Sequence, residues 1–157
     1  MQPITIHRNK TEKAFTLVEF AVVMIIFGLV YMTVSPAVYK MVETAKSSNT
    51  EDIIQDMSDD IDKFLKDNGR YPDSLEEVFG EIPLDPWGNP YQYLNLADVK
   101  SKGKVRKDKN LVPINSDYDL YSMGPDGKTA SPLTAQFSQD DIVRGRNGAF
   151  IGLATEY

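Results

Sequence analysis

The 157-residue chain contains no cysteine and a single histidine, and both shortages restrict its chemistry. Without cysteine there are no disulfide bonds, no thiolate metal sites and no cysteine nucleophile. The one histidine, His7, lies in the N-terminal segment, which excludes a histidine-based site in a folded C-terminal domain. Acidic residues outnumber basic ones, and the formal net charge of −6 makes general nucleic-acid binding unfavourable.

Charge is also missing from one long stretch near the N-terminus. No charged residue occurs from Phe20 to Tyr39, a length that can span a bilayer. The preceding segment carries Arg8, Lys10 and Lys13, which predicts that the N-terminus stays on the cytoplasmic side. Because no A-x-A-like cleavage site follows the apolar run, an ordinary secretory signal peptide is excluded.

A helical pattern continues beyond this uncharged run. Apolar residues recur at helical spacing from Val38 to Ala45 and again from Ile53 to Leu65. The sequence Asp67-Asn68-Gly69 is a typical helix end. We therefore predict one helix from about Phe15 to about Asn68. The alternative is a second helix that begins at a capping box in Ser48–Glu51.

The C-terminal part has the pattern of a small mixed domain. Ser74–Phe79 predicts a short amphipathic helix, and Asp85–Pro90 predicts a rigid turn. Tyr91–Leu96 and Tyr118–Met123 alternate like strands. The predicted fold class is therefore α+β, in which the second half of the long helix packs against a small antiparallel sheet. Trp87, within the turn, is either a ligand-stacking platform or a packing residue.

Catalytic motifs are scarce as well. The pairs Asp59-Asp60 and Asp140-Asp141 are the candidates for acid–base catalysis. Asp59 and Asp60 fall on the polar face of the predicted helix, where charges are normally solvated. The sequence has no G-x-S-x-G motif and no glycine-rich phosphate loop. We therefore predict a protein that is not an enzyme.

Several motifs resemble those of a known family. KAFTLVEF, at residues 13–20, resembles the class III signal of type IV pilins and pseudopilins. The stretches DNGRYPDSLEEV, LDPWGNPYQYL and YDLYSMGPDGK resemble the major pseudopilin of type II secretion systems. The resemblance implies that a prepilin peptidase cuts between Ala14 and Phe15 and that the new amine of Phe15 is methylated. Ala14 departs from the family, which usually has glycine there.

The same resemblance implies a pilin-like division of the chain. Residues 1–14 would be a cleaved leader, and 15–36 a hydrophobic helix that spans the membrane and later forms the filament core. Residues 37–68 would continue this helix in amphipathic form, and 69–157 would form a small periplasmic α+β domain.

The function implied by the resemblance is structural. The chain would polymerise into the pseudopilus of a type II secretion system and drive export of folded proteins across the outer membrane. Its partners would be copies of itself, minor pseudopilins, an inner-membrane assembly platform and the prepilin peptidase, with no nucleic acid. It would be a single-pass inner-membrane protein before assembly and a periplasmic filament afterwards. The alternatives are a type IV pilin or minor pilin for adhesion, motility or DNA uptake, and a membrane-anchored binding module.

Two residues of the apolar helix are candidates for assembly. A carboxylate at Glu19 costs a few kcal/mol at the start of a membrane helix unless it is compensated. The resemblance implies that Glu19 pairs with the ammonium of Phe15, its own or a neighbour's, whereas the alternative is a glutamate that reaches the lipid headgroups. Pro36 lacks an N–H and so loosens the helix, either for filament packing or as a tolerated bend.

A calcium site is implied in the C-terminal loop. Two segments, 123–127 and 138–142, resemble the part of major pseudopilins that holds calcium, an ion that takes six to eight oxygen ligands. Gln139 stands where the family has an aspartate, so a solvated acidic loop is the alternative. The candidate ligands are Met123, Asp126, Ser138, Gln139, Asp140 and Asp141.

A basic loop, residues 99–109, stands out in this acidic protein. It has no aromatic residue that could stack on a base, which argues against nucleic-acid binding. The sequence leaves two further possibilities open, a solvated loop and a contact with acidic residues of a neighbouring subunit.

The first testable prediction concerns processing. In a host with an active prepilin peptidase, the mature protein should start at Phe15 and carry one extra methyl group. Intact-mass spectrometry should show the loss of residues 1–14 together with the mass of that methyl group. A chain that still begins at Met1 in such a host would contradict the resemblance.

Overall fold

The computed structural model describes residues 16–97 and 103–157. The predicted leader, the cleavage and methylation sites at Ala14 and Phe15, and the first part of the basic loop lie outside the described residues. The described residues form two compact units, which divide between Met41 and Val42.

One helix, α1 (Leu17–Asn68), continues through the apolar and the amphipathic segments without a break. In its polar stretch, the Thr50 hydroxyl donates a hydrogen bond of 2.8 Å to the carbonyl of Lys46 in the preceding turn. Thr50 is thus satisfied as an interior helix residue. The prediction of a single helix is confirmed, and the alternative break at Ser48–Glu51 is wrong.

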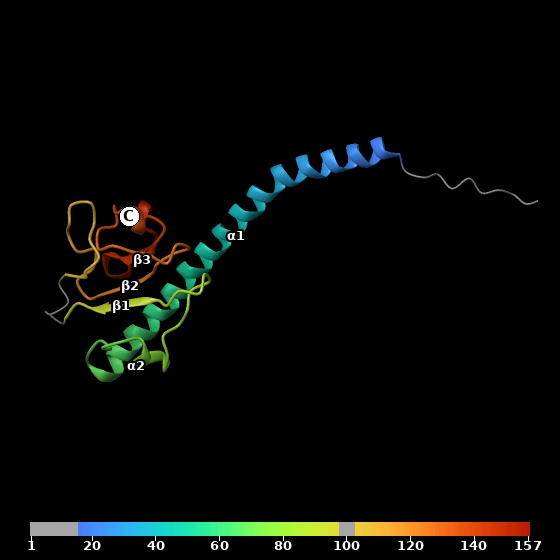
Figure 1. The fold of residues 1–157 in the computed structure, drawn as a ribbon. Helices are drawn as coiled ribbons and strands as arrows, with labels where there is room; N and C mark the ends of the chain where they lie inside the picture. The colour runs from blue at the N-terminus through green and yellow to red at the C-terminus, as the bar shows by residue number, and fades with distance from the viewer. Residues whose placement is uncertain (1–15, 98–102) are drawn as a thin grey trace, which may run out of the picture. The chain divides into compact units, whose positions relative to one another are not determined.

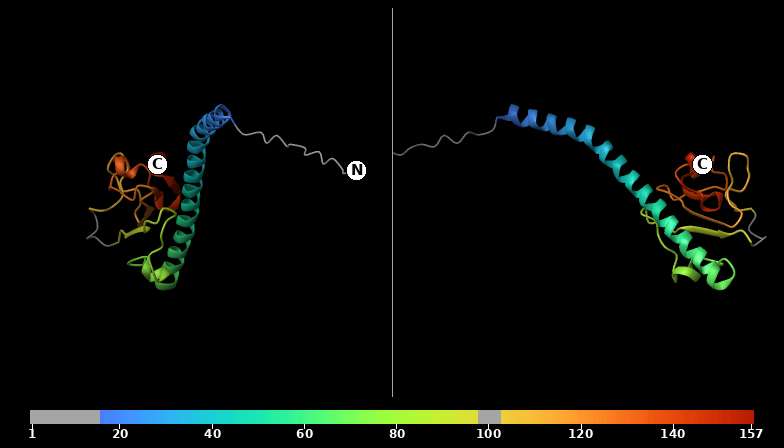
Figure 2. Two further views of the ribbon diagram at one scale, coloured as in Figure 1. Left: turned by 45° about the vertical axis from the view of Figure 1, so that its right-hand side comes forward. Right: turned by 180° about the vertical axis from the view of Figure 1, so that it is seen from behind.

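In the second unit, an antiparallel sheet lies alongside the C-terminal half of α1 (Figures 1 and 2). The described residues form four strands, and neighbours along the chain are also neighbours in the sheet. The short helix α2 (Glu76–Phe79) precedes the sheet, and three 3-10 turns follow the second strand. The strands are β1 (Gln92–Asn95), β2 (Tyr118–Ser122), β3 (Ile142–Gly145) and β4 (Phe150–Leu153), and the 3-10 turns are η2 (Gln136–Ser138), η3 (Arg146–Gly148) and η4 (Ala154–Glu156).

The predicted α+β class is confirmed, and β1 and β2 lie where alternation indicated strands. Strands β3 and β4 were not predicted. All four residues of β3 are buried, so the strand shows no alternation of apolar and polar residues. A usable signal was the Asn147-Gly148 dipeptide between the two strands, which is typical of a hairpin turn.

The core of the domain lies between α1 and the sheet. Ile54, Met57 and Ile61 project from one face of α1 and are almost fully buried against Tyr118 and Leu120 of β2. On the other face of the sheet, loops cover a second apolar cluster. Both faces of the sheet are therefore buried, which explains why polar residues of β2 and β3 are also inaccessible to solvent. The second cluster consists of Ile114, Leu133, Val143 and Ala154.

Trp87 packs on α1. Its indole N–H donates a hydrogen bond of 2.8 Å to the carboxylate of Glu43, and the ammonium of Lys46 lies 5.8 Å from the ring centre. The ring is half-buried. These contacts support the interpretation of Trp87 as a packing residue.

Ile61→Ala should destabilise the domain because Ile61 is fully buried in the core. We expect the free energy of unfolding to fall by about 2–5 kcal/mol, measured by urea denaturation of the full chain in detergent. Lys66→Ala, on the exposed face of the same helix, is the control and should change the value by less than about 0.5 kcal/mol. Equal effects of the two substitutions would contradict this assignment of the core.

Candidate functional site

The N-terminal half of α1 presents an uncovered apolar surface. The large apolar side chains from Leu17 to Met41 are all exposed in the monomer, by fractions between 39% for Val23 and 85% for Leu17. This helix is long and apolar enough to cross a membrane, and its most apolar stretch has a mean hydropathy of 2.4. An exposed apolar surface of this extent indicates contact with lipid or with other proteins.

Glu19 sits in the first turn of this helix and takes part in a capping box. The backbone N–H of Thr16 donates to the Glu19 carboxylate at 2.9 Å, and the Thr16 hydroxyl donates to the same oxygen at 2.8 Å. In return, the backbone N–H of Glu19 donates to the Thr16 hydroxyl at 3.2 Å. The pattern T-x-x-E thus satisfies two N–H groups that a helix start would otherwise leave without partners.

The capping box offsets part of the free-energy cost of placing the Glu19 carboxylate at the start of a membrane helix. It supplies hydrogen bonds to the carboxylate, but both come from a neutral residue, so the negative charge itself is not neutralised. Pairing of Glu19 with the amine of Phe15 stays a prediction, because Phe15 lies outside the described residues. Pro36 lies within α1, which continues on both sides of it, and its role in assembly also stays a prediction.

The predicted calcium ligands separate into two groups. Asp126 and Asp140 lie together, since the backbone N–H of Asp126 donates to the Asp140 carboxylate at 3.3 Å. Ser138 is buried, and its hydroxyl both donates to and accepts from the backbone of Ala130 at 2.8 Å. Gln139 is exposed at the end of η2, and Met123 is half-buried after β2.

Asp141 forms a buried ion pair. Its carboxylate accepts from a guanidinium nitrogen of Arg106 at 2.5 Å and from the hydroxyl of Thr129 at 2.6 Å. Both charged side chains are essentially inaccessible, at 1% and 0% exposure. Burial raises the pKa of Asp141 to about 6, although the Thr129 hydroxyl and the Arg106 guanidinium favour the charged form.

This arrangement does not fit a single calcium site made of all six predicted ligands. An arginine already occupies one side of Asp141, and its positive charge opposes a second cation there. The Ser138 hydroxyl is engaged with the backbone. Within residues 16–97 and 103–157, no three histidine, cysteine, aspartate or glutamate side chains form a group that could hold a metal. Calcium binding itself stays a prediction, for which Asp126 and Asp140 are the remaining paired carboxylates.

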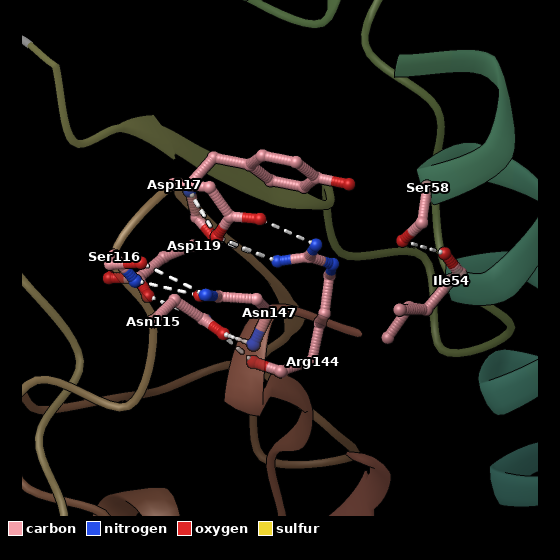
Figure 3. A network of polar contacts seen from close by, with 9 residues as sticks. Ile54, Ser58, Asn115, Ser116, Asp117, Asp119, Arg144 and Asn147 are labelled. Atoms are coloured by element: carbon pink, nitrogen blue, oxygen red, sulfur yellow. Dashed lines mark hydrogen bonds and ion pairs between the residues drawn. The ribbon is translucent and has the colours of Figure 1, made fainter. Parts of the chain in front are cut away.

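A second buried arginine holds the β3–β4 hairpin in place (Figure 3). The guanidinium of Arg144 makes a bidentate contact with Asp117, at 2.7 and 3.0 Å, and lies 3.9 Å from the ring centre of Tyr118. Asn115 donates to the Arg144 carbonyl at 2.9 Å and accepts from the backbone N–H of Asn147. These contacts fix the hairpin turn against the segment before β2.

Sequence reasoning missed the residues that make these contacts. The capping box at Thr16 was readable, because T-x-x-E precedes an apolar run. Arg106 was not distinguishable from the other positive charges of the basic loop, since only the fold shows which one turns inward. Lys104 and Lys109 of that loop are exposed, which is compatible both with a solvated loop and with a contact to a neighbouring subunit.

Gly124→Ala should disrupt the loop that carries Asp126. Gly124 has φ +63°, and an added Cβ would lie 2.3 Å from the backbone carbonyl oxygen of Asp140. We expect a loss of about 1–3 kcal/mol or more in the free energy of unfolding, measured by denaturation of the full chain. Gly103→Ala is the control, because nothing lies within 4 Å of a Cβ there. Equal stability of both variants would show that Gly124 is not constrained.

The chain is similar in sequence to several curated proteins that share one name. The chain is 28% identical over 142 residues to type II secretion system core protein G of Pseudomonas aeruginosa, a match that covers 77% of this chain and 89% of the relative. The protein of the same name from Escherichia coli K12 is 27% identical over 153 residues, covering 84% and 90%. The one from Vibrio cholerae is 27% identical over 141 residues, covering 77% and 86%.

No protein-family model matches the chain, and no solved structure matches it significantly. The alignments with the Pseudomonas and Escherichia relatives nonetheless cover 77% and 84% of the chain. The chain is thus similar over most of its length to type II secretion system core protein G of several bacteria, which confirms the resemblance to major pseudopilins that its motifs carry.

Proposed function

We propose that this protein is the structural subunit that polymerises into the pseudopilus of a type II secretion system, a filament that drives folded proteins across the outer membrane. The proposal rests mainly on the N-terminal half of α1, whose large apolar side chains are exposed. The domain that follows it does not need them, because it buries an apolar core of its own. The names of the relatives agree with it, since each is a core protein of such a system.

The apolar surface serves two states in this proposal. Before assembly, lipid covers the side chains from Leu17 to Val42, because a single apolar helix of this length is stable across a bilayer. In the filament, the same side chains of neighbouring subunits cover one another. The transfer from lipid to protein keeps apolar atoms in apolar surroundings, so packing rather than the hydrophobic effect favours the assembled state.

The function requires no chemistry from this chain. Work on the exported protein would come from an energy source outside the subunit, acting through an inner-membrane platform. The subunit would be inserted in the inner membrane with its C-terminal domain in the periplasm, processed by the prepilin peptidase and joined by minor pseudopilins. The basic segment before the apolar helix supports this orientation.

The two alternative functions predict either a different filament or no filament. A type IV pilin would form a long surface filament needed for motility or adhesion, and an anchored binding module would form no filament. Deletion of the gene should abolish secretion of a reporter exoprotein and leave motility intact, and electron microscopy of overproducing cells should show filaments that contain this chain. Normal secretion in the deletion strain would refute the proposal.

Glu19 allows a sharp test of how assembly is selected. Glu19→Gln retains an oxygen that can accept from Thr16, so the capping box persists while the negative charge disappears. If the charge pairs with the amine of Phe15 during assembly, this variant should insert into the membrane normally but yield less than about a tenth of the wild-type filament. The yield is measured by quantitative immunoblotting of the sheared fraction.

Thr16→Val is the matched control, because it removes the hydroxyl contacts and keeps the charge of Glu19. It should assemble far better than Glu19→Gln, at the cost of a helix cap worth about 1 kcal/mol. The reverse result, with Glu19→Gln assembling and Thr16→Val failing, would show that Glu19 acts as a cap and not as a charge.

A further inference from the structure

Arg106 stands apart from the rest of the basic loop because its guanidinium lies inside the domain. The side chain is 1% exposed, whereas Lys104 and Lys109 of the same loop face solvent. Moving a guanidinium out of water is costly unless it finds oxygen partners. The surrounding loops must therefore supply oxygen atoms that accept hydrogen bonds from the guanidinium.

The partners of Arg106 are the kinds of oxygen that a hard cation takes. The Nη1 nitrogen donates to the hydroxyl of Thr129 and to the carbonyl of Ala130, and Nη2 donates to the carboxylate of Asp141. The third nitrogen, Nε, has no hydrogen-bond partner among the described residues. A hydroxyl, a carbonyl and a carboxylate are also the usual ligands of calcium in proteins. The ring of Tyr121, 4.5 Å from the guanidinium carbon, covers one face of the group.

These contacts join three segments that are far apart in sequence. The backbone of Arg106 is itself fixed, since its N–H donates to Asp119 at 2.7 Å and its carbonyl accepts from Ile114 at 3.0 Å. The guanidinium connects this segment to residues 129–130 and to Asp141 just before β3. An ion bound to the same oxygens would connect residues 129–130 to Asp141, and the arginine side chain joins the segment at residue 106 to them as well.

Asp141 depends on this contact for its charge compensation. Among the described residues, one of its carboxylate oxygens, Oδ1, has no hydrogen-bond partner, and the other accepts only from Arg106 and Thr129. The nearest carboxylate along the chain, Asp140, has its own contact with Asp126 and adds negative charge. Removal of the guanidinium would leave a buried carboxylate without an opposite charge, which is strongly destabilising.

We propose that Arg106 is the built-in cation of the C-terminal domain: its guanidinium holds Asp141 and the loops around it in the way a bound metal ion would, so that the domain closes without calcium. The proposal rests on the contacts of Arg106 and not on the proposed function, so either can fail without the other.

The first test needs no substitution. The full chain, purified in detergent, is melted in excess calcium and in excess EGTA, and the midpoint is followed by circular dichroism. We expect the same midpoint in both conditions. A midpoint that is several degrees higher in calcium than in EGTA would overturn the proposal, because it would show that a bound ion stabilises the domain, as the predicted calcium site requires.

The second test measures the ion pair. Arg106→Met keeps the length of the side chain and removes its charge, and it should lower the midpoint by roughly 10–20 °C. Lys104→Met, two residues away and exposed, is the control and should leave the midpoint unchanged. An unchanged midpoint in Arg106→Met would overturn the proposal.

A double variant distinguishes loss of the ion pair from a general loss of packing around Arg106. Arg106→Met combined with Asp141→Asn no longer leaves a charge buried without a partner, so it should melt above Arg106→Met alone. If the two substitutions simply add their losses, the pair is not coupled and the proposal fails.

Discussion

The contact between one face of α1 and strand β2 supports the rest of the domain. Ile54, Met57 and Ile61 recur at helical spacing and are covered by Tyr118 and Leu120 of the central part of the sheet. Because β2 has β1 on one side and β3 on the other, its position on the helix determines where both neighbours lie. The turn at Asp85–Asn89 then attaches to the end of β2, where Asp85 accepts from Ser122 at 2.6 Å. Loss of the helix contact would therefore expose one face of the sheet.

The domain uses buried arginines where small secreted domains often use disulfides. Arg144 lies over Tyr118 and Arg106 over Tyr121, and these tyrosines point to opposite faces of β2. Each arginine attaches a loop to the sheet through an aspartate, Asp117 in one case and Asp141 in the other. A planar guanidinium suits this use, because it can stack on a ring while its edge donates several hydrogen bonds. A chain without cysteine thereby obtains cross-links between distant segments.

Much of this architecture was predictable from local pattern. The long helix and the first two strands follow from apolar periodicity, and the segment around Glu19 together with the motifs of the C-terminal domain indicated the resemblance to major pseudopilins. Strand β3 was not predicted, because burial on both faces removes the alternation of apolar and polar residues. The hydrogen-bond partners of Asp141 could not be predicted for a different reason. A sequence shows that Asp141 is acidic, but only the path of the chain shows that Arg106, a residue 35 positions earlier, reaches it.

The capping box at Thr16 and Glu19 bears on the lifetime of the unassembled subunit. Since the carboxylate already has two hydrogen bonds from its own chain, part of its cost in the bilayer is met before it finds an opposite charge. In the proposed function, such a subunit would remain in the membrane as a reserve, and a subunit that left a filament would return to that reserve. Growth and shrinkage of the proposed filament would then draw on the same pool, so its length could change without new protein synthesis.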